Sequence, residues 1–145
     1  TFGFGSGEHA GMSNQRDLHQ CAALCWRDTG SDVEILLITS RDTGRWVIPR
    51  GWPMDGKTFS EAAAQEAWEE AGVRGVVHPI PLGRYSYWKP QLHKHLDVSV
   101  FALNVKEVLC SFPERGQRER IWLPPSGAAA KIAEPALAAM IADFL

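Results

Sequence analysis

The chain has 145 residues, with 15 lysines and arginines against 17 aspartates and glutamates, and a formal net charge of -2. This length is typical of a single domain with its own core. The charge argues against a general nucleic-acid or membrane-surface binder, because both draw their affinity from excess positive charge. Three cysteines cannot form a closed disulfide framework, so we expect a reducing, cytoplasmic setting.

Residues 1–16 mix glycine, serine, histidine and asparagine without a period, which predicts a flexible N-terminal arm before a single domain over 17–145. Apolar runs separated by glycine, proline and aspartate turns predict the strands of this domain. The expected strands are Gln20–Trp26, Val33–Thr39, Trp46–Ile48, Gly75–His78, Leu82–Trp88, Leu96–Leu103 and Ile121–Leu123.

One segment carries a strong helix signal. Thr58 is a good N-cap, and Glu61 three residues later completes the capping-box pattern. Ala62–Ala71 is rich in helix formers, and Gly72 supplies a C-terminal stop. A last helix is expected over about Pro135–Phe144. Strands around one long helix, with a second helix at the end, predict an α/β sandwich with a mixed sheet.

The long helix carries three glutamates, Glu66, Glu69 and Glu70, at spacings of three and four residues. Residues at these spacings project onto one side of a helix, where like charges repel one another. Carboxylate oxygens at this density suit Mg²⁺ or Mn²⁺. Spacing alone also fits a solvated acidic face. The loop before the helix favours the metal site, because Gly51 lets backbone carbonyls approach a ligand or metal closely.

The segment Gly51–Val73, GWPMDGKTFSEAAAQEAWEEAGV, resembles the signature box of the Nudix hydrolases in length and register. Its opening glycine, its Glu-X-X-Glu-Glu core and its closing glycine match the family pattern. Two positions depart from it, since Lys57 replaces an early glutamate and Gln65 replaces the arginine before the core.

Similarity beyond the box is to the diphosphoinositol polyphosphate phosphohydrolase branch of that family. It rests on Ser40–Arg41, Arg45–Pro49 and the basic run before a tryptophan in Gly116–Trp122. The resemblance implies a Nudix-type α/β/α sandwich with a mixed β-sheet and a catalytic loop-helix-loop. It further implies metal-dependent hydrolysis of a phosphoanhydride, with a dinucleoside polyphosphate or a diphosphoinositol polyphosphate as the favoured small-molecule substrate.

Carried over position by position, the resemblance implies a metal site of Mg²⁺ or Mn²⁺ on Glu66, Glu70, Glu69 and the Gly51 carbonyl. Glu69 and Glu66 would be the catalytic carboxylates, with Glu69 as the candidate base toward water. Gln65 can donate a hydrogen bond but carries no charge. The alternative function is therefore a weakened Nudix-fold module that binds and senses a phosphorylated ligand.

An anionic substrate also needs cations, and arginine suits bidentate phosphate contacts. Arg41 and Arg50 flank the glycine loop, and Lys57 lies within it. Arg118 and Arg120 form a second group among acidic residues, for which a solvated loop is the alternative reading. The candidate substrate-binding residues are Arg41, Arg50, Lys57, Arg118 and Arg120. Trp52 and Trp88, in or near loops, are further candidates to cover a substrate.

Overall fold

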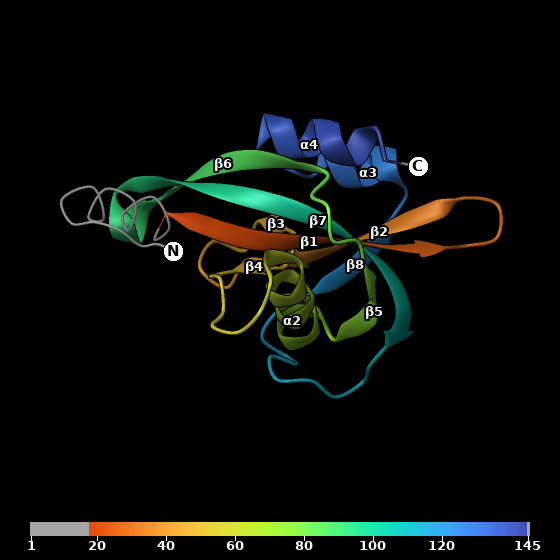
Figure 1. The fold of residues 1–145 in the computed structure, drawn as a ribbon. Coiled ribbons are helices and arrows are strands. Elements are labelled where there is room, and N and C mark those ends of the chain that lie inside the picture. Colours follow the sequence, from red (N-terminus) through yellow and green to blue (C-terminus); the bar gives the residue numbers. More distant parts are fainter. Residues whose placement is uncertain (1–17, 145) are drawn as a thin grey trace.

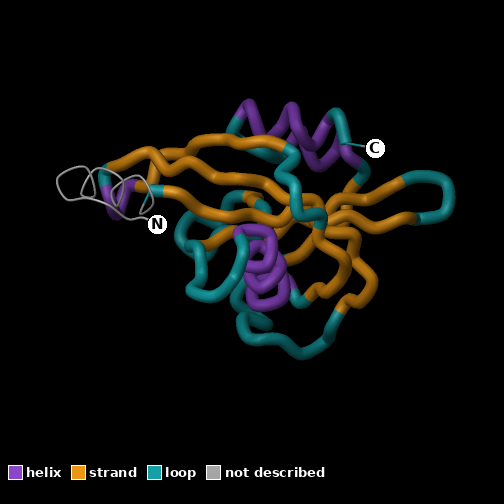
Figure 2. Tube along the Cα trace, in the orientation of Figure 1, coloured by secondary structure: helices purple, strands orange, loops and turns teal. Residues whose placement is uncertain are grey.

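The computed structural model describes residues 18–144, so the predicted arm over residues 1–16 lies outside the described residues. Within them, a mixed sheet of eight strands is packed between helices (Figures 1 and 2). The strands are β1 (His19–Asp28), β2 (Val33–Thr39), β3 (Trp46–Val47), β4 (Arg50–Gly51), β5 (Val73–Val77), β6 (Gly83–Lys89), β7 (Lys94–Val108) and β8 (Arg120–Leu123). The helices are α2 (Phe59–Ala71), α3 (Pro125–Ala130) and α4 (Pro135–Ala142), with a short 3₁₀ helix η1 (Pro90–Leu92).

The centre of the sheet is the parallel pair of β1 and β7, and the other pairings are antiparallel. Helix α2 covers one face, and α3 with α4 covers the other (Figure 1). This arrangement confirms the predicted α/β/α sandwich with a mixed sheet. None of the helices in residues 18–144 is long and apolar enough to span a membrane.

Alternation along β1 explains the two layers, because successive side chains of a strand point to opposite faces. Cys21, Ala23 and Cys25 are buried in the core beneath α2. Ala22 and Leu24 belong to the core beneath α3 and α4. A strand buried on both sides reads as a continuous apolar run, as this one does.

Helix α2 begins and ends where its sequence predicts. Thr58 Oγ1 accepts a hydrogen bond from the main-chain N–H of Glu61, and the Glu61 carboxylate accepts one from the N–H of Thr58. Gly72 ends the helix in the left-handed region, with φ of 68°, where glycine is strongly favoured. Alanines form the buried face, whereas Trp68 is only partly buried and lies under Arg74.

Three details of the fold differ from the sequence prediction. The third strand stops at Val47, and the chain then pairs again with β1 through β4, a segment expected to be a loop. Helix α3 was not predicted, because its short sequence of proline, glycine and alanines carries no apolar period. Strand β7 continues beyond Leu103 to Val108, since its polar end forms a ladder with β5 at the edge of the sheet.

Candidate active site

The pairing of β4 with β1 presses the loop before α2 against the helix. Cys21 pairs with Gly51 in this ladder. The carboxylate of Glu66 occupies the space next to Gly51 so closely that a Cβ at this position would collide with it. A glycine is therefore required here by close approach of the main chain to Glu66, not by an unusual backbone angle.

Glu70 is the second carboxylate of this site, and it is 8% exposed. Its Oε1 accepts a hydrogen bond of 3.3 Å from the main-chain N–H of Arg50, and its Oε2 lies 3.8 Å from the Arg118 guanidinium. The same guanidinium donates to Glu114 Oε1 at 3.0 Å and to the Thr39 carbonyl at 3.1 Å. Glu70 is thus fixed by one main-chain donor and one shared cation.

Glu66 and Glu70 both hold a proton more tightly than a free carboxyl group does. Burial is the main cause that raises the pKa of Glu66, to about 9, and the neighbouring Glu70 adds to it. Burial also raises the pKa of Glu70, to about 7, and Arg118 opposes this rise. With its pKa raised this far, Glu66 holds a proton at neutral pH. A divalent cation would replace this proton and let both carboxylates ionise.

The donor set fits such a cation, because hard oxygen ligands suit Mg²⁺ and Mn²⁺. Glu66, Glu70 and the main chain of Gly51 line one cavity of about 290 Å³, with Glu114 also in its wall. Within the described part of the chain, no three carboxylate, imidazole or thiol groups converge tightly enough to form a ready-made cage. The residues supply two adjacent carboxylates, and substrate or water would complete the coordination, as is usual for Mg²⁺.

Glu69 lies in a different environment from its two neighbours. Its Oε2 accepts a hydrogen bond of 2.8 Å from Gln65 Nε2, and its carbonyl accepts one of 2.9 Å from the N–H of Glu114. It is not among the described residues that line the cavity. The helix therefore directs Glu66 and Glu70 into the cavity and places the Glu69 carboxylate beside Gln65.

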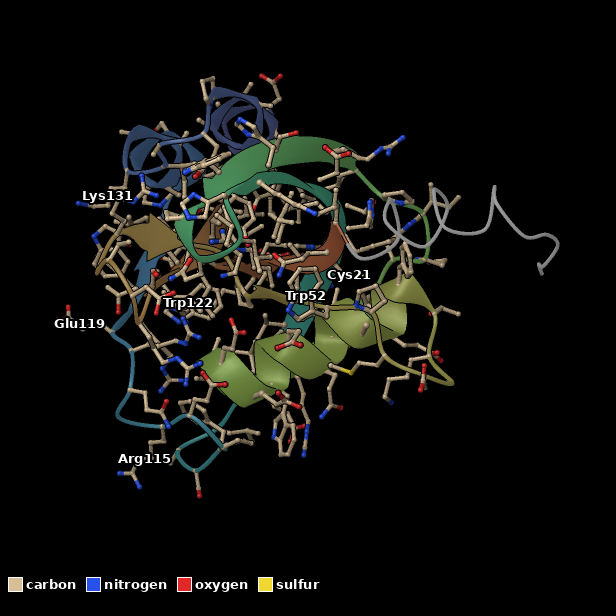
Figure 3. The ribbon with its side chains drawn as sticks, turned by 90° about the vertical axis from the view of Figure 1, so that its left-hand side faces the viewer. Cys21, Trp52, Arg115, Glu119, Trp122 and Lys131 are labelled. Carbon is tan, nitrogen blue, oxygen red and sulfur yellow. The ribbon has the colours of Figure 1, made fainter. Side chains whose placement is uncertain are left out.

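Cations gather around the cavity that contains the two glutamates. Arg41, Arg50 and Arg118, three of the predicted substrate-binding residues, line it together with Lys89. Trp52 is 39% exposed and also lies in its wall, beside α2 in Figure 3. The complete lining is Gln20, Ser40, Arg41, Asp42, Val47, Ile48, Arg50, Gly51, Trp52, Glu66, Glu70, Tyr87, Lys89, Glu114 and Arg118.

Two predicted substrate-binding residues lie elsewhere. Arg120 donates a hydrogen bond of 2.8 Å to the carbonyl of Ala71 at the end of α2, and its guanidinium lies 5.0 Å from the centre of the Phe112 ring. Lys57 is exposed in the loop before α2. Neither is among the described residues that line the cavity.

Sequence reasoning missed several residues of this cavity. Glu114 was interpreted only as part of a mixed-charge loop, and Gln20 and Tyr87 lie on strands with no motif to mark them. They reach the cavity because β1 and β6 each pair with β7. The one local signal was Arg118, whose spacing of four from Glu114 matches their ion pair.

Comparison with known proteins defines the class first. The fold is similar to a crystal structure of a C. elegans Ap4A hydrolase binary complex, with a TM-score of 0.67, 18% identity, and coverage of 86% of this chain and 93% of that chain. Residues 18–144 match the NUDIX domain family. The chain belongs to this family, as its box over Gly51–Val73 predicts.

Curated relatives agree with this assignment. Nudix hydrolase 13, mitochondrial, of Arabidopsis thaliana is 36% identical over 104 residues, which cover 66% of this chain and 52% of the relative. Diphosphoinositol polyphosphate phosphohydrolase 3-beta of Bos taurus is 32% identical over 105 residues, which cover 71% of this chain and 62% of the relative. The predicted similarity to the diphosphoinositol polyphosphate phosphohydrolase branch is thus confirmed. The chain spans about half the length of the first of these relatives.

Proposed function

We propose that the chain hydrolyses a phosphoanhydride bond in a polyphosphorylated small molecule, with Mg²⁺ or Mn²⁺ held by Glu66 and Glu70. The observation that carries this proposal is the buried carboxylate pair, packed against Gly51 in a cavity whose wall also holds three arginines. A buried pair of like charges is costly, and the arrangement serves a purpose only if a cation and an anionic ligand meet there.

A divalent metal at this site would neutralise phosphate oxygens and lower the pKa of a bound water. The side chains of the protein bind the substrate and accept a proton. Arg41, Arg50 and Arg118 bind phosphate oxygens that the metal does not reach. A carboxylate then accepts the proton of the attacking water. Glu66 and Glu114 line the cavity, whereas the predicted base, Glu69, lies beside it and is held by Gln65.

The favoured substrates are dinucleoside polyphosphates and diphosphoinositol polyphosphates. Two relatives support this choice by name, one as an Ap4A hydrolase and the other as a diphosphoinositol polyphosphate phosphohydrolase. Both substrate classes carry several adjacent phosphates, which suits a cavity with four cationic side chains in its wall.

The test is product release from a panel of phosphoanhydrides, measured with Mg²⁺, with Mn²⁺ and with a chelator. The panel holds a diadenosine polyphosphate, a diphosphoinositol polyphosphate, a nucleoside triphosphate, ADP-ribose and inorganic polyphosphate. Glu70→Gln should lower metal-dependent turnover by about a hundredfold or more, because loss of even an outer-shell partner costs ten- to hundredfold. Glu107→Gln, the same change at an exposed position on β7, is the matched control.

The outcomes separate the two candidate functions. Metal-dependent turnover that Glu70→Gln abolishes and Glu107→Gln preserves supports the hydrolase. Stabilisation by metal together with one panel member, without any product, would instead support the ligand-sensing module. Turnover that survives in Glu70→Gln would remove this carboxylate from the reaction.

A cytoplasmic location stays a prediction from the cysteines, of which Cys21 and Cys25 are buried free thiols. The Arabidopsis relative is named as a mitochondrial protein. Imaging of the full-length natural protein, fused at its C-terminus to a fluorescent protein, distinguishes the two compartments.

A further inference from the structure

A second cavity, of about 490 Å³, adjoins the one with the glutamates. It lies between the turn after β2, the end of β6 with η1, and the start of α4. Arg50, Tyr87 and Lys89 line both cavities. The two spaces are therefore compartments of a single cleft, and these side chains mark the passage between them.

Arg50 contacts the carboxylate site through its main chain and the passage through its side chain. Its main-chain N–H donates to Glu70 Oε1 at 3.3 Å. Its guanidinium donates to the hydroxyl of Tyr85 at 3.3 Å and lies 3.8 Å from the centre of the Tyr87 ring. Because the main chain and the guanidinium of Arg50 are both held in place, Arg50 itself sets the distance between the carboxylate site and this guanidinium.

The ring beneath the guanidinium is itself fixed. Tyr87 is 8% exposed, and its hydroxyl donates a hydrogen bond of 2.7 Å to Gln20 Oε1 on β1. Gln20 is 4% exposed. Packing of the buried ring in the core holds Tyr87 in place, the hydrogen bond to Gln20 adds to this, and the guanidinium lies over the ring.

The Arg50 guanidinium is held by neutral groups in the described part of the chain. Among the described residues, no carboxylate forms an ion pair with it. Its contacts are a neutral hydroxyl and an aromatic face, although a guanidinium presents five donors in a fork that matches phosphate. A partly buried cation held in this way is a site for an anion supplied from outside.

We propose that Arg50, oriented by Tyr87, binds one phosphate of the substrate chain at the passage and thereby sets which phosphorus faces Glu66 and Glu70. The inference rests on the proposed hydrolysis and deepens it. Arg50 is the binding residue, and Tyr87 is a positioning residue that acts through it. The second compartment, with the half-exposed Trp88 in its wall, receives the part of the substrate beyond that phosphate.

The predicted consequence is a choice among the phosphoanhydride bonds of the substrate. In a diadenosine tetraphosphate, water oxygen bonds to one phosphorus as its bridging P–O bond breaks, and the products are ATP with AMP or two ADP. A fixed phosphate contact selects one of these product pairs. If the guanidinium loses its fixed place, the chain can slide by one phosphate, and both pairs form.

The test compares wild type, Tyr87→Leu and Tyr87→Phe with diadenosine tetraphosphate and Mg²⁺. Tyr87→Leu removes the ring under the guanidinium, and we expect it to change a dominant product pair into a mixture. Tyr87→Phe keeps the ring face and should preserve the product ratio, which makes it the matched control. A second measurement, calorimetric binding of inorganic tripolyphosphate, should weaken about tenfold in Tyr87→Leu and in Arg50→Met. Thermal unfolding identifies any variant that fails to fold.

The two readouts separate the two hypotheses. A changed product ratio in Tyr87→Leu, restored in Tyr87→Phe, supports the inference. An unchanged ratio in a folded Tyr87→Leu variant overturns it, as does unchanged tripolyphosphate binding in folded Arg50→Met. If wild type shows no turnover, the proposed hydrolysis fails and the choice of bond fails with it, whereas weakened tripolyphosphate binding would still support the phosphate contact of Arg50.

Discussion

The buried carboxyl groups of Glu66 and Glu70 lower the stability of the metal-free fold, because they lie next to each other away from water. Glu66 is pressed against Gly51, and the neighbouring Glu70 raises its pKa. Among the described residues, Arg118, at 3.8 Å from Glu70, is the only cation that forms an ion pair with either group. At alkaline pH, where both groups ionise, removing one charge from this pair should stabilise the metal-free protein, even as it removes the metal site.

A pH titration tests this interpretation. The pKa of Glu66 rises from 4.5 to about 9 on folding. Between these values the folded protein keeps a proton that the unfolded chain has lost, so the free energy of unfolding falls as the pH rises. In chelator, we expect wild type to lose on the order of 2 kcal/mol across this window, a figure discounted for solvent screening.

Glu66→Gln should flatten this dependence, since it removes the shifted group. Denaturant unfolding at a series of pH values measures the effect, and saturating Mg²⁺ should restore wild-type stability at the alkaline end. Equal slopes for wild type and Glu66→Gln in chelator would contradict the assignment.

At the scale of elements, the contact between β4 and α2 joins the sheet to the catalytic helix. Gly51→Ala tests that contact. A Cβ there would collide with the Glu66 carboxylate, the movable end of a side chain, so the collision displaces the carboxylate and leaves the fold intact. We expect kcat/KM to fall by about a hundredfold, the cost of a small misplacement at a reacting centre, with little change in Tm.

Gly127→Ala is the matched control for this prediction. A Cβ at Gly127 would meet Leu123 Cβ at 3.8 Å, an ordinary contact, so activity and Tm should both stay close to wild type. Unfolding of Gly51→Ala without loss of activity at low temperature would show that the glycine serves the sheet and not the carboxylate.

The elements also show how far the sequence could predict this site. Helix α2 was predictable because its signals are local, with Thr58 and Glu61 three residues apart, and the spacing of Glu66 and Glu70 places both on one face. Strand β4 was not, because two residues carry no pattern and pair only once β1 exists. Arg120 was misjudged for a similar reason, since only the folded chain brings it to the Ala71 carbonyl.

On the scale of the whole molecule, cationic side chains gather at one cavity although the net charge is slightly negative. The chain has a formal net charge of -2, yet Arg41, Arg50, Arg118 and Lys89 gather at one cavity. The same lining contains Asp42, Glu66, Glu70 and Glu114, so the field would attract an anionic ligand once a divalent cation neutralises the glutamates, and added salt screens it. The net charge argues against general nucleic-acid binding, but it could not reveal this cluster, which arises from segments far apart in the sequence.

The salt dependence of catalysis tests whether this cluster acts on substrate from a distance. Raising the ionic strength shortens the Debye length below about 10 Å, so KM for a polyphosphate substrate should rise several-fold while kcat at saturation stays nearly constant. Lys89→Gln should raise KM and reduce its response to salt, because it removes one of the charges that salt screens. Lys131→Gln, which changes an exposed lysine outside both cavities, should leave both quantities as in wild type. If KM responds equally to salt in Lys89→Gln and Lys131→Gln, the substrate is attracted by the charge of the whole surface and not by the cations of the cleft.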